Sequence, residues 1–291
     1  QWLLEQQQRR HLSCQSPDLP AVCTLVANDQ LIEAAHTSPA GPICGFSSKV
    51  LISTLQASGF ARCFAGSVKP NYKKWVALRD VHQLSHVTAL DRYPALYAGA
   101  AAVAEALHGH QPLQILVLGC STGEEPFTLA QRYFTRASHR LDAADIAAAA
   151  VETAVQQHAH PRIRYFRVGE PGVAGQHCYQ LVFANSIFCR WPASRGATTI
   201  AELYPFAAFE AALAEIDQQL ATGGLLALYN ANYRFGDTAL AGRYVPLKLQ
   251  GLDESGFVTK FDPDGQLSCD QAYPYALFLK LADATVSLAP S

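Results

Sequence analysis

The sequence contains no methionine, no paired cysteines, no long apolar run and no excess of charge of one sign. The missing methionines, the initiator included, indicate an unusual composition or a sequence from which residues are missing, so spacings between motifs are treated as minimum values. With 22 Lys and Arg residues against 24 Asp and Glu residues, the formal net charge is −2. This balance gives no electrostatic argument for DNA, RNA or an anionic membrane as a partner.

The apolar and cysteine patterns exclude further classes. No segment approaches the ~20 apolar residues that a membrane helix needs, and residues 1–10 lack the apolar core of a signal peptide. The eight cysteines are scattered and none forms a C-x-x-C pair, so neither a zinc site nor a dithiol redox centre is expected. We therefore expect no metal, a reducing cytoplasmic compartment, and thiols that are mostly buried as small apolar groups.

The chain is long enough for a large domain with a smaller unit attached. It has 291 residues, of which 49% are hydrophobic and 16% charged, a balance typical of a compact folded chain. In the first part, 1–80, a helix is expected near 47–55, with Gly59 ending it. Short apolar runs near 61–64 and 75–78 predict two strands, so this part is expected to form a small α+β unit.

Residues 81–291 show a regular alternation of strand and helix patterns. The run 115–118 is short, aliphatic and bounded by chain breakers, as in a central parallel strand covered on both faces. The runs 257–261 and 276–281 flank a turn-rich connection at 262–265 and predict an antiparallel closing pair. The expected fold class is therefore α/β, with a doubly wound, mostly parallel sheet. The other expected strands are 140–145, 163–168, 179–184 and 225–230, and the expected helices are 97–107, 124–134, 147–158 and 206–221.

A glycine-flanked loop follows the central strand directly. Between Gly119 and Gly123 the chain turns at once into a helix, and a glycine lets the backbone approach a ligand closely because it has no Cβ. In open α/β sheets, ligands bind over the carboxyl ends of the strands. The spacing alone also suits an ordinary tight turn, so the acids around it decide between the two interpretations.

Two sets of acids accompany the loop. Asp145 closes the second expected strand, where a carboxylate can hydrogen-bond both hydroxyls of a ribose. Asp142 is the alternative, because the sequence does not fix the end of that strand, and Asp145 also suits a cap of the following helix. Glu124 and Glu125 occupy the helix N-terminus where a dinucleotide places its pyrophosphate, which their charge would repel. A zwitterionic methionyl group beside a sulfonium tolerates carboxylates, so the charges favour S-adenosylmethionine over NAD or FAD.

The loop also carries a family resemblance. The run GCSTGEEPFTLA at 119–130 resembles the cofactor motif of the CheR-type methyltransferases, which act on chemoreceptor glutamates, and of related Rossmann-like methyltransferases. The stretch DRYP at 91–94 is similar to the same wider group, and the resemblance covers about 91–281. It implies S-adenosylmethionine as the cofactor, with the paired acids as candidates for its methionyl or sugar part and Asp145 for its ribose.

The sequence departs from this pattern in several places. After the fourth strand, 184–186 is Ala-Asn-Ser where the chemoreceptor enzymes have Cys-Arg-Asn, and Cys189 comes later. Gln180 stands where an acid is common. The resemblance therefore extends to the cofactor and the reaction type and leaves out the chemotaxis substrate. A further resemblance, of 38–75 to the closing segment of another methyltransferase-like domain, would make 1–80 the tail of a second module.

The candidate site residues follow from these patterns. By the resemblance, the methyl group points towards the loops after the fourth and fifth strands, 185–192 and 229–235, whose amide, aromatic and guanidinium groups can orient an acceptor. The alternatives for these side chains are surface ion pairs for the arginines and packing for the tryptophan. The candidate cofactor-binding residues are Gly119, Cys120, Ser121, Thr122, Gly123, Glu124, Glu125, Asp145, Ile146, Asn185 and Ser186, and the candidate substrate-binding residues are Arg190, Trp191, Asn230, Asn232, Tyr233 and Arg234.

The expected chemistry needs alignment more than proton transfer. If the acceptor must lose a proton, Tyr233 and Asp237 are the candidate bases, with His82 and His86 also available. The expected function is S-adenosylmethionine-dependent methyl transfer to a small-molecule or glycan-type acceptor. One alternative is a catalytically inactive methyltransferase-like binding or scaffold protein, to which the truncated character of 1–80 points. Another is a NAD(P)-dependent oxidoreductase, which the paired acids disfavour.

Overall fold

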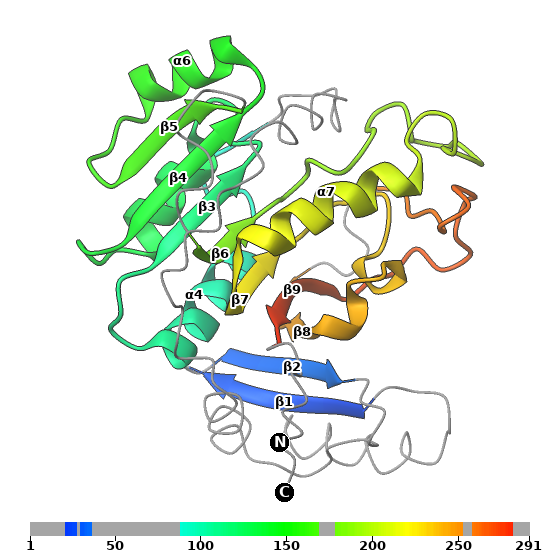
Figure 1. The fold of residues 1–291 in the computed structure, drawn as a ribbon, viewed down its shortest axis with the longest axis horizontal. Coiled ribbons are helices and arrows are strands. Elements are labelled where there is room, and N and C mark those ends of the chain that lie inside the picture. The colour runs from blue at the N-terminus through cyan, green and yellow to red at the C-terminus, as the bar shows by residue number, and fades with distance from the viewer. Residues whose placement is uncertain (1–20, 28–29, 37–87, 169–177, 253–257, 282–291) are drawn as a thin grey trace, which may run out of the picture.

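A single nine-stranded sheet organises the protein in the computed structural model, which describes residues 21–27, 30–36, 88–168, 178–252 and 258–281 (Figure 1). Its strands lie in the spatial order β1 (Ala21–Ala27), β2 (Gln30–His36), β8 (Tyr244–Leu249), β9 (Tyr275–Lys280), β7 (Leu220–Ala227), β6 (Tyr179–Phe183), β3 (Gln114–Leu118), β4 (Arg140–Asp145) and β5 (Ile163–Arg167).

The strand directions confirm the predicted fold class. Strands β5, β4, β3, β6 and β7 are parallel neighbours, whereas β9 runs antiparallel to both β7 and β8. The antiparallel closing pair consists of β8 and β9, and β9 corresponds to the strand expected at 276–281. The strand expected at 257–261 is wrong over 258–261, the part of it that the structure describes. Within 258–261, Phe261 forms only an isolated bridge to Leu267. The strand β8 escaped the sequence analysis because Pro246 and Lys248 interrupt its apolar pattern.

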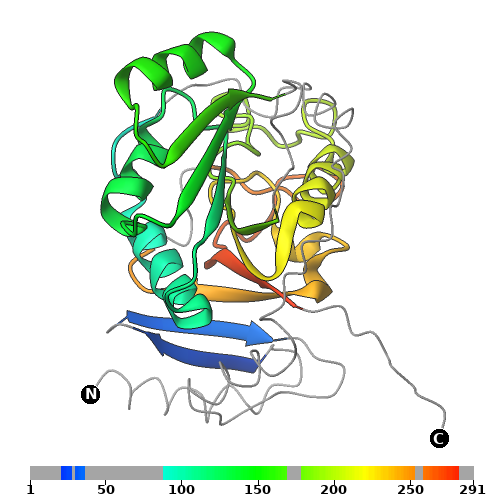
Figure 2. The same cartoon turned by 60° about the vertical axis from the view of Figure 1, so that its left-hand side comes forward.

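Helices cover both faces of the sheet (Figures 1 and 2). The alternation along β3 shows the division, because Ile115 and Val117 belong to one buried cluster and Leu116 and Leu118 to the other. The helix Pro94–His108 covers the first face and the helix Phe206–Gln219 the second. The helical elements are α4 (Pro94–His108), α5 (Glu124–Thr128), the π-helix η3 (Leu129–Tyr133), α6 (Ala148–Gln157), α7 (Phe206–Gln219) and the 3₁₀ turns η4 (Phe235–Asp237) and η5 (Ala241–Arg243).

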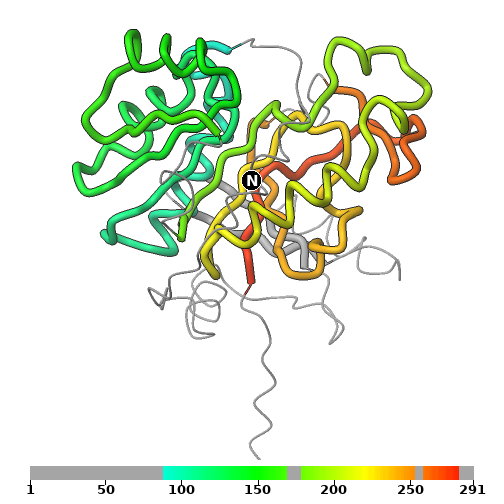
Figure 3. Tube along the Cα trace, turned by 45° about the horizontal axis from the view of Figure 1, so that its top comes forward, coloured from blue at the N-terminus to red at the C-terminus, as the bar shows by residue number. Residues whose placement is uncertain are grey.

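The order of the strands divides the sheet into two halves that lie side by side. In Figure 3 the green segment with β4, α6 and β5 lies on one side, and the yellow to orange segment with α7 and β8 lies on the other. The switch between these halves occurs at β3 and β6, which are parallel neighbours in the sheet although β4 and β5 come between them in the sequence. Open α/β sheets bind ligands at the carboxyl ends of the strands beside such a switch.

The described part of the N-terminal region extends the same sheet. Strands β1 and β2 pair antiparallel with each other, and β2 pairs antiparallel with β8, so this hairpin lies along one edge of the sheet (Figure 2). The helix expected at 47–55 and the strands expected at 61–64 and 75–78 lie outside the described residues. A division of the chain near residue 80 stays a prediction.

Other expectations concern the cysteines and the membrane. Among the described residues, Cys120 and Cys189 are buried, Cys178 and Cys269 are exposed, and these four thiols are free. No helix in the described ranges combines the length and apolar character needed to cross a membrane.

Candidate active site

The loop after β3 has a backbone that requires both of its glycines. Gly119, at the end of the buried strand, is exposed and has φ +67°, and Gly123 has φ +97°. A Cβ on Gly119 would lie 2.2 Å from Cγ2 of Ile187, and one on Gly123 would lie 2.9 Å from Cβ of Ala154. The glycines therefore let two neighbouring segments pack against a sharp turn, and α5 begins directly after it.

Asp145 fastens this loop to the neighbouring strand. It is the last residue of β4 and is buried. Its Oδ2 accepts a hydrogen bond from the backbone N–H of Ser121 (2.9 Å), and its Oδ1 accepts one from the N–H of Ala147 (2.9 Å). The second bond forms a local turn ahead of α6, whose N-cap is Ala147 without a side-chain cap, and the first brings the carboxylate to the loop. Because each carboxylate oxygen has two acceptor sites, capacity remains for a ligand hydroxyl. Ile146 follows and is half-buried.

Asp142, the alternative acid, is fully engaged inside the fold. It lies in the middle of β4, where Arg164 donates to both of its oxygens, from Nε to Oδ1 (2.9 Å) and from a terminal nitrogen to Oδ2 (2.6 Å). The Tyr179 hydroxyl donates to the same Oδ2 (2.7 Å). Of the two acids, Asp145 is thus the one positioned beside the loop.

The paired acids after the loop have different surroundings. Glu124 is half-buried, and the hydroxyl of Thr122 donates to its carboxylate (2.8 and 2.7 Å). Glu125 is buried, and Nδ2 of Asn185 donates to its Oε1 (2.6 Å). Burial raises the pKa of Glu125 to about 7, although the Asn185 hydrogen bond and the Arg92 charge oppose that rise. Glu124 therefore bonds within the loop, whereas Glu125 links the start of α5 to the residues that follow β6.

One buried polar atom beside Glu125, Oδ1 of Asn185, lacks a hydrogen-bond partner among the described residues. The Tyr97 hydroxyl interacts with the Glu125 carboxylate, and burial together with that charge raises the pKa of the hydroxyl. Buried polar groups are normally satisfied, so Oδ1 of Asn185 marks a place where a polar ligand group fits.

A second polar cluster joins the ends of β6 and β7. The hydroxyls of Tyr93 and Ser186 lie 2.6 Å apart, and Nδ2 of Asn230 donates to both, at 3.2 and 3.3 Å. Ser186 and Asn230 each have φ +57°, a conformation that non-glycine residues rarely adopt and that clusters at functional sites. The ring of Tyr229 packs edge-on against Tyr93, with centroids 5.2 Å apart. The structure thus brings the predicted Ser186 and Asn230 together.

The sequence analysis did not name Arg92 and Tyr93 as candidate site residues. The DRYP stretch that contains them was noted only for its resemblance to the wider methyltransferase group. Asp91 holds this stretch in place: its N–H donates to Oγ1 of Thr128 (3.0 Å), and its carboxylate accepts from Arg132 (2.6 Å) and from the Tyr133 hydroxyl (2.7 Å). The stretch is therefore tied to α5 and η3, which continue the cofactor-type loop.

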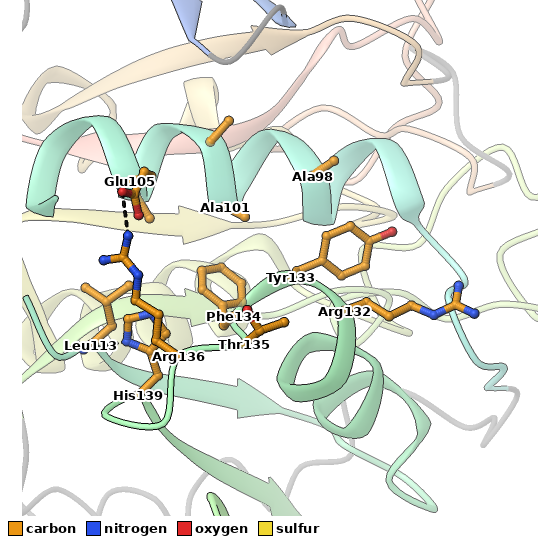
Figure 4. A pocket seen from close by; sticks show the side chains of 12 residues that line it. Ala98, Ala101, Glu105, Leu113, Arg132, Tyr133, Phe134, Thr135, Arg136 and His139 are labelled. Atoms are coloured by element: carbon orange, nitrogen blue, oxygen red, sulfur yellow. Dashed lines mark hydrogen bonds and ion pairs between the residues drawn. The ribbon is translucent and has the colours of Figure 1, made fainter. Parts of the chain in front are cut away.

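A cavity of about 490 Å³ lies on the other side of that anchor, between α4 and η3. Figure 4 shows Tyr133 and Phe134 below the alanine face of α4, with the Glu105–Arg136 ion pair at one end (2.6 Å). Its lining includes Arg132 and Tyr133 and none of the loop residues 119–125. This cavity therefore has no place in the site formed by the loop.

Two predicted acceptor residues are internal braces. Asn232 is fully buried; its Oδ1 accepts from the N–H of Arg190 (2.6 Å), and its Nδ2 donates to the carbonyl of Thr259 (2.8 Å). The Tyr233 side chain is also buried, and its hydroxyl donates to the Tyr204 carbonyl. These contacts hold the loops together and leave the Tyr233 hydroxyl engaged rather than aimed at the polar cluster.

The other predicted residues make bracing contacts or lie near the surface. Nε of Arg190 donates to the carbonyl of Leu203 (3.3 Å), and Arg234 pairs with the exposed Asp270 (3.5 Å), which are the bracing roles weighed from the sequence. Trp191 is half-buried. Asp237 ends η4 on the exposed surface, and partial desolvation raises its pKa. His82 and His86 lie outside the described residues.

Lys260 is a buried titratable residue of the acceptor region that sequence reasoning missed. Its Nζ donates to the carbonyl of Ala231 (2.6 Å), one residue after Asn230. No motif surrounds it, and the only available signal is its position in a short run between two turns.

Comparisons with known proteins give distant structural likenesses only. No protein-family model and no curated protein matches the sequence. Among solved structures, CalS10, an amino pentose methyltransferase from Micromonospora echinaspora, matches with 19% identity and a TM-score of 0.32 over 53% of this chain and 60% of that chain. A TehB-like SAM-dependent methyltransferase from Corynebacterium glutamicum matches with 22% identity and a TM-score of 0.36 over 62% and 87%. The matched part spans 46 to 60% of the first three such structures.

Proposed function

We propose that the protein is an S-adenosylmethionine-dependent methyltransferase. The observation that carries the proposal is the arrangement at the carboxyl end of β3. There an exposed Gly119 follows a buried strand, Asp145 bonds to the loop, and Glu124 begins the next helix. This is the position at which open α/β sheets bind nucleotide-containing ligands.

The charges around the loop support this cofactor over a dinucleotide. The N–H groups of a helix N-terminus attract a pyrophosphate, but here the Glu124 carboxylate lies within hydrogen-bond distance of Thr122 in the same turn. A pyrophosphate would meet that negative charge at short range. A cationic sulfonium and an ammonium are stabilised by it.

The residues present also fit the shape of the proposed ligand. Asp145 has acceptor capacity for ribose hydroxyls, and the unpartnered Oδ1 of Asn185 lies beside Glu125. Gly119, Cys120, Ser121, Thr122 and Gly123 form the loop over which the ligand would lie, with Ile146 beside Asp145. When bound, the cofactor supplies a methyl group activated by a sulfonium.

The chain's own contribution is to position the acceptor. Methyl transfer is an in-line displacement, so its rate depends on holding donor and nucleophile in line. We assign that task to the Tyr93–Ser186–Asn230 cluster, which lies where β6 and β7 end and next to the Glu125–Asn185 pair. The acceptor is proposed to be a small molecule, because the cluster holds two hydroxyls and an amide within hydrogen-bond distance of one another, which suits a single small polar group.

The test is calorimetric titration with S-adenosylhomocysteine. Asp145→Asn keeps the side-chain shape and removes the charge, and we expect it to weaken binding by about 1–3 kcal/mol, as for hydrogen bonds to a charged group. Glu152→Ala, an exposed acid on α6, is the control and should bind like the wild type. Absence of binding by the folded wild type would refute the proposed cofactor. Transfer of labelled methyl into a metabolite extract then separates an enzyme from a binding protein.

A further inference from the structure

The side chain of His158 reaches from the end of α6 to the loop after β3. Its Nδ1 lies 2.8 Å from the carbonyl oxygen of Thr122, a residue 36 positions away in the sequence. A carbonyl oxygen only accepts hydrogen bonds, so Nδ1 carries the proton and donates it. The imidazole therefore links the connection between α6 and β5 to the loop that we propose binds the cofactor.

The surroundings of His158 fix its ring and its backbone. The ring of Phe127, on α5, packs against the imidazole with centroids 5.1 Å apart. The backbone N–H of His158 donates to the Ala154 carbonyl (2.9 Å), and its own carbonyl accepts from the Tyr165 hydroxyl (3.0 Å). A side chain that is already ordered loses little rotamer freedom when it forms a hydrogen bond. The bond to Thr122 is therefore made by a preorganised donor.

The loop that receives this bond has a strained backbone. Ser121 has φ +48°, a conformation that a non-glycine residue keeps only when its surroundings hold it. Asp145 holds the N–H of Ser121 at 2.9 Å, and His158 holds the carbonyl of the next residue, Thr122. Two consecutive residues of the turn are thus fixed from two different elements, β4 and the segment after α6.

We propose that His158 is a positioning residue, which keeps the loop in its binding conformation before S-adenosylmethionine arrives. The identity of the ligand rests on the proposed function. A loop that is ordered in advance does not lose its conformational freedom on binding, so the affinity rises. The alternative is that His158 only ends α6, but its backbone N–H does this without the side chain.

The first test uses amide hydrogen exchange in the ligand-free protein. The N–H groups of Ser121 and Gly123 report on the loop, because they donate to Asp145 and to the Cys120 carbonyl. His158→Ala should speed exchange at both amides by about three- to tenfold, the effect of losing one hydrogen bond. His158→Asn should restore most of the protection, because its Nδ2 takes the place of Nδ1.

His160→Ala is the matched control. His160 is half-buried like His158 and its ring also packs against Phe127, with centroids 6.3 Å apart. Its Nδ1 accepts from the N–H of Arg162 and does not bond to the loop. Exchange at the loop amides should therefore be unchanged in His160→Ala. Unchanged exchange in His158→Ala would overturn the proposal, and so would equal acceleration in the two alanine variants.

The second test measures S-adenosylhomocysteine binding by calorimetry, on samples that urea unfolding shows to be folded. His158→Ala should bind about three- to tenfold more weakly than the wild type, whereas His158→Asn and His160→Ala should bind nearly as tightly as it does. Equal affinity of the wild type and His158→Ala would overturn the positioning role. If the wild type does not bind S-adenosylhomocysteine, the proposed cofactor is refuted, and the exchange rates of the ligand-free loop still decide whether His158 holds it.

The tautomer of His158 gives a readout that needs no variant. The ¹⁵N resonances of a neutral histidine ring show which nitrogen carries the proton, and here the proton is expected on Nδ1. The spectrum of the wild type, recorded at pH 9, measures this directly. A neutral ring protonated on Nε2 alone would overturn the proposal, because such a ring cannot donate to the Thr122 carbonyl through Nδ1.

Discussion

Glu125 should make the stability of the protein depend on pH in an uncommon direction. Burial raises its pKa from 4.5 to about 7, so the folded state disfavours the ionised carboxylate. The contribution of the neutral acid is fully present below pH 4.5 and is lost as the pH rises through 7. A shift of this size corresponds to about 3 kcal/mol at 1.36 kcal/mol per pKa unit.

The substitution Glu125→Gln isolates this effect. The amide keeps an oxygen that accepts from Nδ2 of Asn185 and removes the charge. The variant should have nearly the stability of the wild type at pH 4.5 and should exceed it by about 3 kcal/mol at pH 8. Urea unfolding at a series of pH values, in the absence of ligand, measures the difference. A difference that stays constant from pH 4.5 to 8 would refute the reasoning, because it would show that the carboxyl titrates alike in both states.

Further predictions concern stability and ligand binding. Asp217→Asn should lower the free energy of unfolding by about 3–5 kcal/mol, since it leaves the buried ammonium of Lys280 without its counter-ion; a loss under 1 kcal/mol in urea unfolding would argue against that ion pair. Gly119→Ala should cost about 2–3 kcal/mol because of its φ of +67° and the approach of Ile187. Adding Ile187→Ala should restore only the steric part, and full restoration would show that the backbone conformation is not strained.

The parts of the fold that the sequence predicted are those with strong local patterns. The aliphatic run of β3 sits between breakers, and its alternating side chains supply both cores, so strand and layers could be predicted together. The edge of the sheet could not be predicted in the same way. Strand β8 contains Pro246 and Lys248, and only its pairing with β9 makes it a strand.

The same distinction holds for the candidate site: its local features could be predicted from the sequence, and its long-range contacts could not. The loop and Asp145 follow from glycines and an acid close in sequence, and the structure joins them through Ser121. The role of Tyr93 depends on contacts with Ser186 and Asn230, which are 93 and 137 residues away, and no local pattern encodes those distances. Tyr233 shows the converse, because its residue type suggested a base while long-range packing placed its hydroxyl on a carbonyl.

The side chain of Asn232 holds three segments of the proposed acceptor region together by hydrogen bonds. It joins the loop after β6, through Arg190 and Ser194, to the segment before Phe261, through Thr259, and its own backbone belongs to the loop after β7. None of these three segments can shift alone without breaking a buried hydrogen bond, so they form one rigid wall. Displacement of any one of these loops would therefore disturb the other two as well.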